Sequence, residues 1–154
     1  MLKQKQVIGS AETITLPSIS PKTIHARIDS GARTSAIWGR ARVGEDHKLY
    51  VSFFEGDGVE HKFDAYGQQV VATSMGHIDT RYTIKTVVKL KGRRIRATFT
   101  IADRSTQVYP VLIGRNVLRG KFVVDVQFGK SLKAKEKKRI SDLQETLGNE
   151  KRAL

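Results

Sequence analysis

Cysteine is absent from the 154-residue sequence, which excludes disulfide bonds, thiolate zinc sites and a cysteine nucleophile. No stretch of apolar residues approaches the roughly 18 that a membrane-spanning helix requires. The first residues, Met-Leu-Lys-Gln-Lys-Gln, lack the apolar core of a secretory signal. We therefore expect a cytoplasmic protein without a membrane partner.

Acidic residues are scarce relative to basic ones. The chain has 28 lysines and arginines against 15 aspartates and glutamates, a formal net charge of +13. This charge attracts polyanions such as nucleic acids or acidic peptides without choosing among them. Aromatic residues make up only 7% of the chain, and no recognised RNA-binding motif interleaves them, so stacking on single-stranded nucleic acid is poorly supported. We therefore prefer an acidic protein as partner, although nucleic acid stays open.

Hydrophobic residues make up a modest 39% of a chain long enough for one domain. This favours a thin β architecture over a deep α/β core. Hairpins are predicted around residues 55–58, 74–79 and 92–93, where turn residues separate strand-like segments. In the segment 83–91, Ile84, Thr86, Val88 and Leu90 share one face of a strand, and mostly lysines share the other.

Further strands are predicted outside these hairpins. Residues 7–9 and 12–17 are expected to pair with each other as short strands. Residues 23–28 are expected to form a strand that ends at a turn, and residues 122–128 to form the last strand. All these elements indicate an all-β fold for residues 1–129.

The composition changes after Gly129. Residues 130–154 contain eight lysines or arginines and four aspartates or glutamates, with apolar residues at roughly helical spacing. We predict a basic helical tail over 130–154 that frays from Gly148. A solvated helix lying on the body explains this segment as well as a binding role does.

Two apolar segments end in motifs that point to one kind of site. Residues 27–37 read Arg-Ile-Asp-Ser-Gly-Ala-Arg-Thr-Ser-Ala-Ile, and residues 111–118 read Val-Leu-Ile-Gly-Arg-Asn-Val-Leu. An Asp-Ser-Gly tripeptide alone occurs by chance in many chains, and Asp29 could be an ordinary aspartate at the end of a strand. The second segment, with Gly114 about 85 residues later, favours a site in which it braces the aspartate turn.

From about residue 7 to residue 128 the chain resembles a bacterial family named as ATP-dependent zinc proteases and now regarded as retropepsin-like. The resemblance rests on residues 26–36, 81–82, 102–104, 109–118 and 122–125. It implies a closed retropepsin-like acid-protease β-barrel with one short helix after the Ile-Gly-Arg-Asn motif. Because relatives are associated with ATP-grasp ligases that add glutamate, it also implies a functional association with such a ligase.

The resemblance implies an aspartic peptidase with Asp29 as its catalytic residue. Such enzymes use two carboxylates that share one proton. This chain offers one Asp-Ser-Gly, so the second carboxylate must come from a second copy across a two-fold axis, which predicts a homodimer. In the active-site turn, Gly31 permits the tight backbone and exposes Asp29. The Ser30 hydroxyl can lock the turn across the axis, and Ala32 is small enough to lie under the substrate.

The segment Gly114, Arg115 and Asn116 is expected to act as the structural brace of the turn. In retropepsins a carboxylate after Asp-Thr-Gly-Ala often pairs with the arginine of Gly-Arg-Asn. Here that position is Arg33, so Arg115 requires another partner.

A flap that excludes water and holds the peptide is expected by analogy with retropepsins. Counting back from the turn at Gly92 places it at Ser74, Met75, Gly76 and His77. An ordinary surface turn explains these residues equally well.

Metal and nucleotide sites are not supported by the sequence. Many relatives have a histidine where this chain has Trp38, the four histidines are scattered, and no His-Glu-x-x-His motif occurs. No phosphate-binding loop of the Gly-x-x-x-x-Gly-Lys-Ser/Thr type occurs either. We therefore expect no metal and no cofactor, and assign any use of ATP to a partner. A zinc-dependent protease, as the older family name states, remains an alternative.

Basic residues gather on the hairpin around residues 92–93, and solvated strand faces explain most of them: Lys85, Lys89, Lys91, Arg93, Arg94 and Arg96. As a functional interpretation we prefer an acidic substrate, such as a glutamate-tailed ribosomal protein. The alternative is a non-catalytic basic module of the same fold that docks on a ribosomal or ATP-grasp partner.

Overall fold

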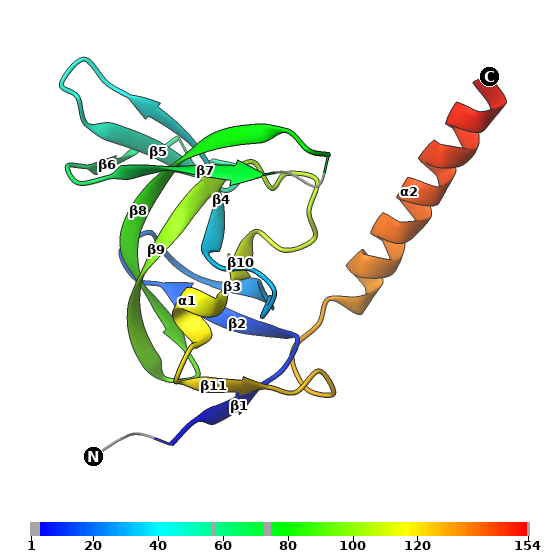
Figure 1. Cartoon of the computed structure of the whole chain (residues 1–154), viewed down its shortest axis with the longest axis horizontal. Helices are drawn as coiled ribbons and strands as arrows, with labels where there is room; N and C mark the ends of the chain where they lie inside the picture. The colour runs from blue at the N-terminus through cyan, green and yellow to red at the C-terminus, as the bar shows by residue number, and fades with distance from the viewer. Residues whose placement is uncertain (1–3, 57, 73–74, 154) are drawn as a thin grey trace.

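The structure is a computed structural model that describes residues 4–56, 58–72 and 75–153, with side chains through residue 150 (Figure 1). Its strands and helices follow in this order: β1 Gln6–Ile8, β2 Ala11–Leu16, β3 Ser20–Ile28, β4 Ser35–Val43, β5 Leu49–Phe53, β6 His61–Phe63, β7 Gly67–Ala72, β8 Ile78–Leu90, β9 Arg93–Ala102, β10 Val111–Ile113, α1 Arg115–Leu118, β11 Phe122–Val124 and α2 Lys133–Ala153.

One closed barrel contains most of the strands. Hydrogen-bonded neighbours follow the order β10-β3-β2-β8-β9-β4, and β10 also pairs with β4, which closes the ring. The short strand β10 runs parallel to β3, with Val111 opposite Ala26, and antiparallel to β4, with Val111 opposite Ile37. The predicted all-β barrel with a short helix after residue 114 is therefore confirmed.

Alternation along the strands fills the barrel interior. In β8 the side chains of Ile84, Thr86, Val88 and Leu90 are buried, whereas the lysines between them are exposed, as the sequence predicts. Phe99 of β9 is the largest fully buried side chain. Burying one such side chain is worth about 1.5–3 kcal/mol. The core thereby fixes the strands that carry the two motifs.

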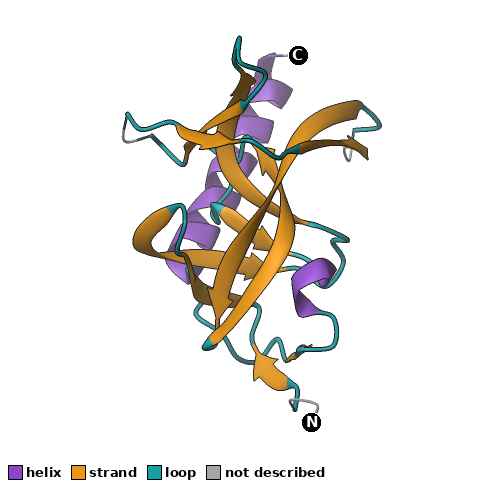
Figure 2. Cartoon of the chain, turned by 90° about the vertical axis from the view of Figure 1, so that its left-hand side faces the viewer, coloured by secondary structure: helices purple, strands orange, loops and turns teal. Residues whose placement is uncertain are grey.

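Two hairpins extend from the barrel at the end opposite β1 and β11, and Figure 2 shows both from a second side. The β5–β6 hairpin continues from β4 through the pairing of Gly39 with Phe53. Strand β7 pairs with the first half of β8, from Gly67 opposite Thr83 to Ala72 opposite Ile78. The three predicted hairpins are thus present, and the β7–β8 hairpin is a two-stranded arm.

Two strand predictions near the chain ends are wrong. Strand β1 pairs in parallel with β11, with Gln6 opposite Phe122, instead of pairing with residues 12–17. The reason is that both edges of β2 are occupied, one by β3 and the other by β8. Strand β11 ends at Val124 because Asp125 forms a turn, in which its Oδ1 accepts the backbone N–H of Gln127 at 3.0 Å.

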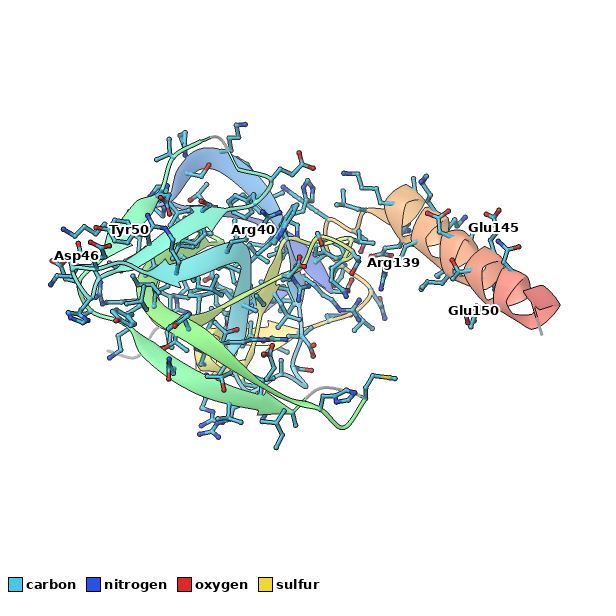
Figure 3. All side chains as sticks on the ribbon, turned by 90° about the horizontal axis from the view of Figure 1, so that it is seen from above. Arg40, Asp46, Tyr50, Arg139, Glu145 and Glu150 are labelled. Carbon is cyan, nitrogen blue, oxygen red and sulfur yellow. The ribbon has the colours of Figure 1, made fainter. Side chains whose placement is uncertain are left out.

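Helix α2 begins on the barrel and extends into solvent (Figures 1 and 3). The Tyr109 hydroxyl donates to Glu136 Oε1 at 2.6 Å and accepts the backbone N–H of Leu132 at 3.0 Å. In Figure 3 Arg139 lies near the body, where it donates to the Thr106 carbonyl, and Glu145 lies farther out. No helix within the described ranges is long and apolar enough to cross a membrane.

The helix also runs farther than predicted. It continues through Gly148 to Ala153 instead of fraying there. One glycine in a helix costs only about 1 kcal/mol relative to alanine, which does not by itself end the helix. The division of the chain at residue 130 remains a prediction.

The outer face of the β8–β9 hairpin carries positive charge, and of the basic residues on this hairpin Lys91 pairs with Glu12 at 3.6 Å. Lys89 lies directly opposite Arg94, and both are exposed. Among the residues that the structure describes, no salt bridge reaches Lys85, Lys89, Arg94 or Arg96. Like charges directly opposite each other destabilise a strand pair, so this face does not serve stability.

We predict that Lys89→Glu raises the free energy of unfolding by about 0.2–1 kcal/mol, because it replaces repulsion across the strand pair by attraction to Arg94. Urea denaturation measures the change. The control is Lys85→Glu, which alters the net charge equally but lies opposite Thr98, so its effect is expected to be smaller. Equal effects of the two variants would show that net charge, and not the pair, determines the outcome.

Candidate active site

Asp29 directly follows β3 on a turn fixed by the backbone. Its N–H donates to the carbonyl of Ile113 at 2.8 Å, and its carbonyl accepts the N–H of Ala32 at 3.2 Å. Its side-chain Oδ1 accepts the N–H of Gly31 at 2.9 Å. Within the described residues Oδ2 has no hydrogen-bond partner. The carboxylate is half-buried, and Ser30 and Gly31 beside it are exposed, so one carboxylate oxygen is oriented while the other is available.

Arg115 holds the same turn from the second segment. Its backbone N–H donates to the Ala32 carbonyl at 2.8 Å. Its guanidinium Nη1 donates to the carbonyls of Ser30 at 3.2 Å and Gly31 at 2.9 Å. Backbone carbonyls of the turn thus take the place of the carboxylate that is missing at Arg33. The partner of Arg115, which the sequence leaves open, is the turn itself.

A buried hydroxyl connects the two motifs, and sequence reasoning missed it. Ser35 is fully buried. Its Oγ accepts the N–H of Gly114 at 2.9 Å and donates to Asn116 Oδ1 at 2.8 Å. The amide nitrogen of Asn116 donates in turn to the Thr98 carbonyl at 2.8 Å. The available signal was a serine at the start of an apolar strand, because a buried polar group there requires partners.

Gly114 lies where the two segments touch. A Cβ at this position would lie 2.4 Å from the carbonyl oxygen of Thr34 and 2.9 Å from that of Ala32. Both neighbours are backbone atoms, which cannot rotate away as a side chain could. The close approach of the two motifs therefore requires glycine.

The expected flap residues lie at the end of the β7–β8 arm. The last strand pair of the arm joins Ala72 and Ile78. The tip beyond this pair contains Met75, Gly76 and His77. Gly76 has a φ of 79°, a conformation that glycine adopts without strain, and the Met75 side chain is 80% exposed. Ser74 lies outside the described residues. A flap role for this tip remains a prediction.

Positive charge gathers near Asp29 from three segments of the chain. Burial lowers the pKa of Arg104, the charges of Arg81 and Arg27 lower it further, and the Asp29 carboxylate acts in the opposite direction. Arginine nevertheless stays protonated in proteins. Arg104 is held by a hydrogen bond from its Nε to the Tyr109 carbonyl at 2.9 Å. Arg27 and Ser30 line one pocket of about 300 Å³, which Tyr109 also lines.

His61 and Trp38 contact other parts of the fold. His61 stacks edge-on against Phe53, with ring centroids 5.2 Å apart. Trp38 is half-buried and lines a groove of about 510 Å³ between α2 and residues 105–110. In the part of the chain that the structure describes, no three side chains of histidine, cysteine, aspartate or glutamate group together as metal ligands.

The barrel, in which β10 of the second motif lies between β3 and β4, agrees with a comparison of the sequence with family models. The model for RimB-like proteins, described as retropepsin-like aspartic endopeptidase RimB, matches residues 7–136. The chain belongs to the RimB-like family. This confirms the retropepsin-like family that the motifs indicate.

Relatives with curated names are longer proteins. A "Probable alpha-L-glutamate ligase" of Shewanella halifaxensis is 31% identical over 143 residues, which are 81% of this chain and 29% of the ligase. A protein of the same name from Desulfotalea psychrophila is 26% identical over 139 residues, which are 79% of this chain and 28% of that protein. The chain thus spans less than a third of the length of these relatives.

A solved structure shows the same fold. The crystal structure of Lpg0085, a Legionella pneumophila protein of unknown function, superimposes with a TM-score of 0.60. The match covers 83% of this chain and 98% of that one, at 18% sequence identity. At this identity the similarity supports the architecture alone.

We predict that Gly114→Ala lowers the free energy of unfolding by about 3 kcal/mol, since the added methyl group meets two backbone carbonyls. The urea midpoint measures the loss. The matched control is Gly148→Ala in α2, where a Cβ would meet nothing within 4 Å. That variant should be up to about 1 kcal/mol more stable than the natural protein. A Gly114→Ala protein of unchanged stability would contradict the close contact between the motifs.

Proposed function

We propose that the protein is an aspartic endopeptidase that acts as a homodimer, with Asp29 of each subunit as the catalytic carboxylate. The observation that carries the proposal is the turn at Asp29. Ile113 and Arg115 hold its backbone from the second motif, and Gly31 orients one carboxylate oxygen. Membership of the RimB-like family supports the same reaction.

The chemistry requires a second chain because each chain supplies one such aspartate. Two Asp29 carboxylates meeting at a two-fold axis cannot both ionise easily, so they share one proton. The ionised carboxylate takes a proton from water, which attacks the peptide carbonyl while the protonated carboxylate donates to the carbonyl oxygen. As the C–N bond of the tetrahedral intermediate breaks, the carboxylate that took the proton from water passes it to the leaving nitrogen, and a hydroxyl of the intermediate returns a proton to the other carboxylate. The exposed Ser30 hydroxyl is proposed to bond across the axis.

The tip of the β7–β8 arm is proposed to close over the bound peptide. Closure excludes water and holds the substrate backbone against the turn. A two-stranded arm suits this role, because its outer strand β7 pairs with β8 alone among the described strands.

The proposed substrate is an acidic protein, and a glutamate-tailed protein in particular. The charge of +13 favours acidic chains. Relatives that contain a similar segment are named glutamate ligases, so a peptidase acting beside an ATP-grasp ligase is a consistent assignment. The ligase reaction itself is not proposed for this chain, which corresponds to less than a third of those proteins.

A second candidate function is a non-catalytic docking module of the same fold. The observation in its favour is the positive face of β8–β9, where Lys89 opposes Arg94. Such a face suits a ribosomal or ligase partner. If the partner is a nucleic acid and not an acidic protein, the affinity should depend steeply on salt concentration. A docking module does not need the Asp29 carboxylate, so a variant of Asp29 distinguishes the two candidate functions.

Asp29→Asn should abolish hydrolysis of a glutamate-rich peptide, because the amide keeps the shape of the carboxylate but cannot exchange the proton. The cleavage products are measured by mass spectrometry, with Asp64→Asn, an exposed aspartate paired with Lys48, as the control. Sedimentation should show a dimer for the natural protein and both variants. EDTA should leave the activity intact.

Several outcomes would contradict this assignment. A protein that stays monomeric at high concentration, or an Asp29→Asn variant with full activity, would exclude the dimeric aspartate mechanism. Loss of activity with EDTA and its return with zinc would instead support the metal-dependent protease of the older family name.

We predict that the rate is highest below neutral pH and falls as pH rises, because the reaction needs the one proton that the two carboxylates share. The measurement is kcat/KM for one peptide from about pH 4 to about pH 9. An activity that climbs steadily across this range would rule out a shared-proton dyad.

A further inference from the structure

We infer that Arg27, Arg81 and Arg104 form a subsite that binds a carboxylate of the substrate next to the scissile bond. This inference rests on the proposed function, since it places the subsite beside the Asp29 turn. It assigns a role in specificity to three arginines that take no part in the proton transfers.

The three arginines come from separate segments. Thr83 of β8 lies opposite Thr100 of β9, so Arg81 lies close to the end of β9 that Arg104 follows. Arg27 lies in β3 between Ala26 and Ile28, both buried, and its own side chain is exposed. Strand alternation therefore directs Arg27 to the same side as Asp29, two residues later. One pocket is lined by Arg27, Ser30 and Glu136, which places Arg27 beside the catalytic turn.

Arg104 forms the less mobile part of the subsite. It follows the end of β9 and is half-buried, with its Nε fixed on the Tyr109 carbonyl at 2.9 Å. Tyr109 is buried and lines the pocket that contains Arg27 and Ser30. The backbone at Tyr109 thus connects Arg104 to the wall of the pocket.

Arg81 approaches from the arm that carries the proposed flap. It lies in β8 opposite Gln69 of β7, three residues after the start of the strand at Ile78. Its Nε contacts Asp79 Oδ2 at 3.3 Å, and its side chain is 29% exposed. Because Arg81 is on the arm, closure of the flap would move its charge relative to Arg27 and Arg104.

Two carboxylates offset part of the positive charge of the three arginines: Asp79 forms a salt bridge with Arg81, and the charge of Asp29 acts on Arg104. A guanidinium offers five N–H donors, yet Arg104 uses one, and no carboxylate lies within salt-bridge distance of it in the described ranges. Arg81 and Arg27 lie near enough to repel it. A partly buried charge without a partner is unfavourable. A carboxylate entering between the arginines would accept two parallel hydrogen bonds and remove the repulsion.

An alternative role is simple neutralisation of the two aspartates in the dimer. In that case removing an arginine would change the rate for every substrate by the same factor. A subsite for a substrate carboxylate predicts instead a change that depends on whether the substrate carries the negative charge.

The test compares Arg104→Met with the natural protein on two peptides that differ only by glutamate or glutamine beside the cleaved bond. Methionine keeps the apolar length of the side chain and removes the guanidinium. The ratio of kcat/KM for the glutamate peptide to that for the glutamine peptide should fall about ten- to a hundredfold. Arg119→Met, an exposed arginine after α1, is the control and should leave the ratio unchanged.

A second pair of peptides, with a free or an amidated C-terminus, locates the recognised carboxylate. Preference for the free acid, lost in Arg104→Met, would assign the subsite to a chain end, whereas a glutamate preference that survives amidation would assign it to a side chain. Both results support the subsite. Should Arg104→Met fail to fold, Arg27→Met at the exposed position replaces it.

Failure of the inference and failure of the proposed function are distinguishable. If Arg104→Met cleaves both peptides with an unchanged ratio, or loses the same factor on both, the subsite is wrong while the peptidase stands. If the natural protein cleaves nothing, binding of the two peptides to Asp29→Asn by fluorescence anisotropy still tests the arginines. Equal affinities there for the glutamate and glutamine peptides would overturn the inference.

Discussion

The pairing of β10 with two strands at once is the constraint on which the rest of the structure depends. Three residues, Val111 to Ile113, close the barrel by joining β3 and β4. The carbonyl that ends this strand, that of Ile113, accepts the N–H of Asp29. The strand pairing that closes the barrel therefore also fixes Asp29. The residue directly after β10 must be glycine, Gly114, because no side chain fits between the two segments. Barrel stability and turn geometry cannot vary independently in this molecule.

Much of this arrangement could be predicted from the sequence because both motifs end strongly apolar strands. Alternation also predicts the buried face of β8, where a register error would expose every core residue at once. The pairing of β1 with β11 could not be predicted, since the sequence does not show that β3 and β8 occupy both edges of β2. The role of Ser35 and the partner of Arg115 could not be predicted either, because both are defined by contacts between residues about 80 positions apart in the sequence.

Positive charge in this protein is arranged in two ways that differ physically. On the outer face of β8–β9 the charges are solvated, so water and salt screen their repulsion over about 10 Å. Around Asp29, Arg104 is half-buried and screening is weaker, so repulsion from Arg81 and Arg27 acts at closer to full strength. The first arrangement suits attraction of an acidic partner over a distance, and the second suits discrimination after contact. Both arrangements of charge can act on one acidic substrate, the first during its approach and the second after it makes contact.

Besides the proposed Ser30 bond across the axis, the turn is shaped by hydrogen bonds within one chain. Ile113, Arg115 and the Ser35–Asn116 pair supply them without a second copy. On the proposed mechanism, dissociation of the dimer would therefore remove the second carboxylate while the first kept its geometry. The rate would then follow the concentration of the dimer, and the unfolding free energy would rise with it as well, because association stabilises the folded chain. A peptidase built in this way can be regulated by association alone, with no rearrangement of its catalytic turn.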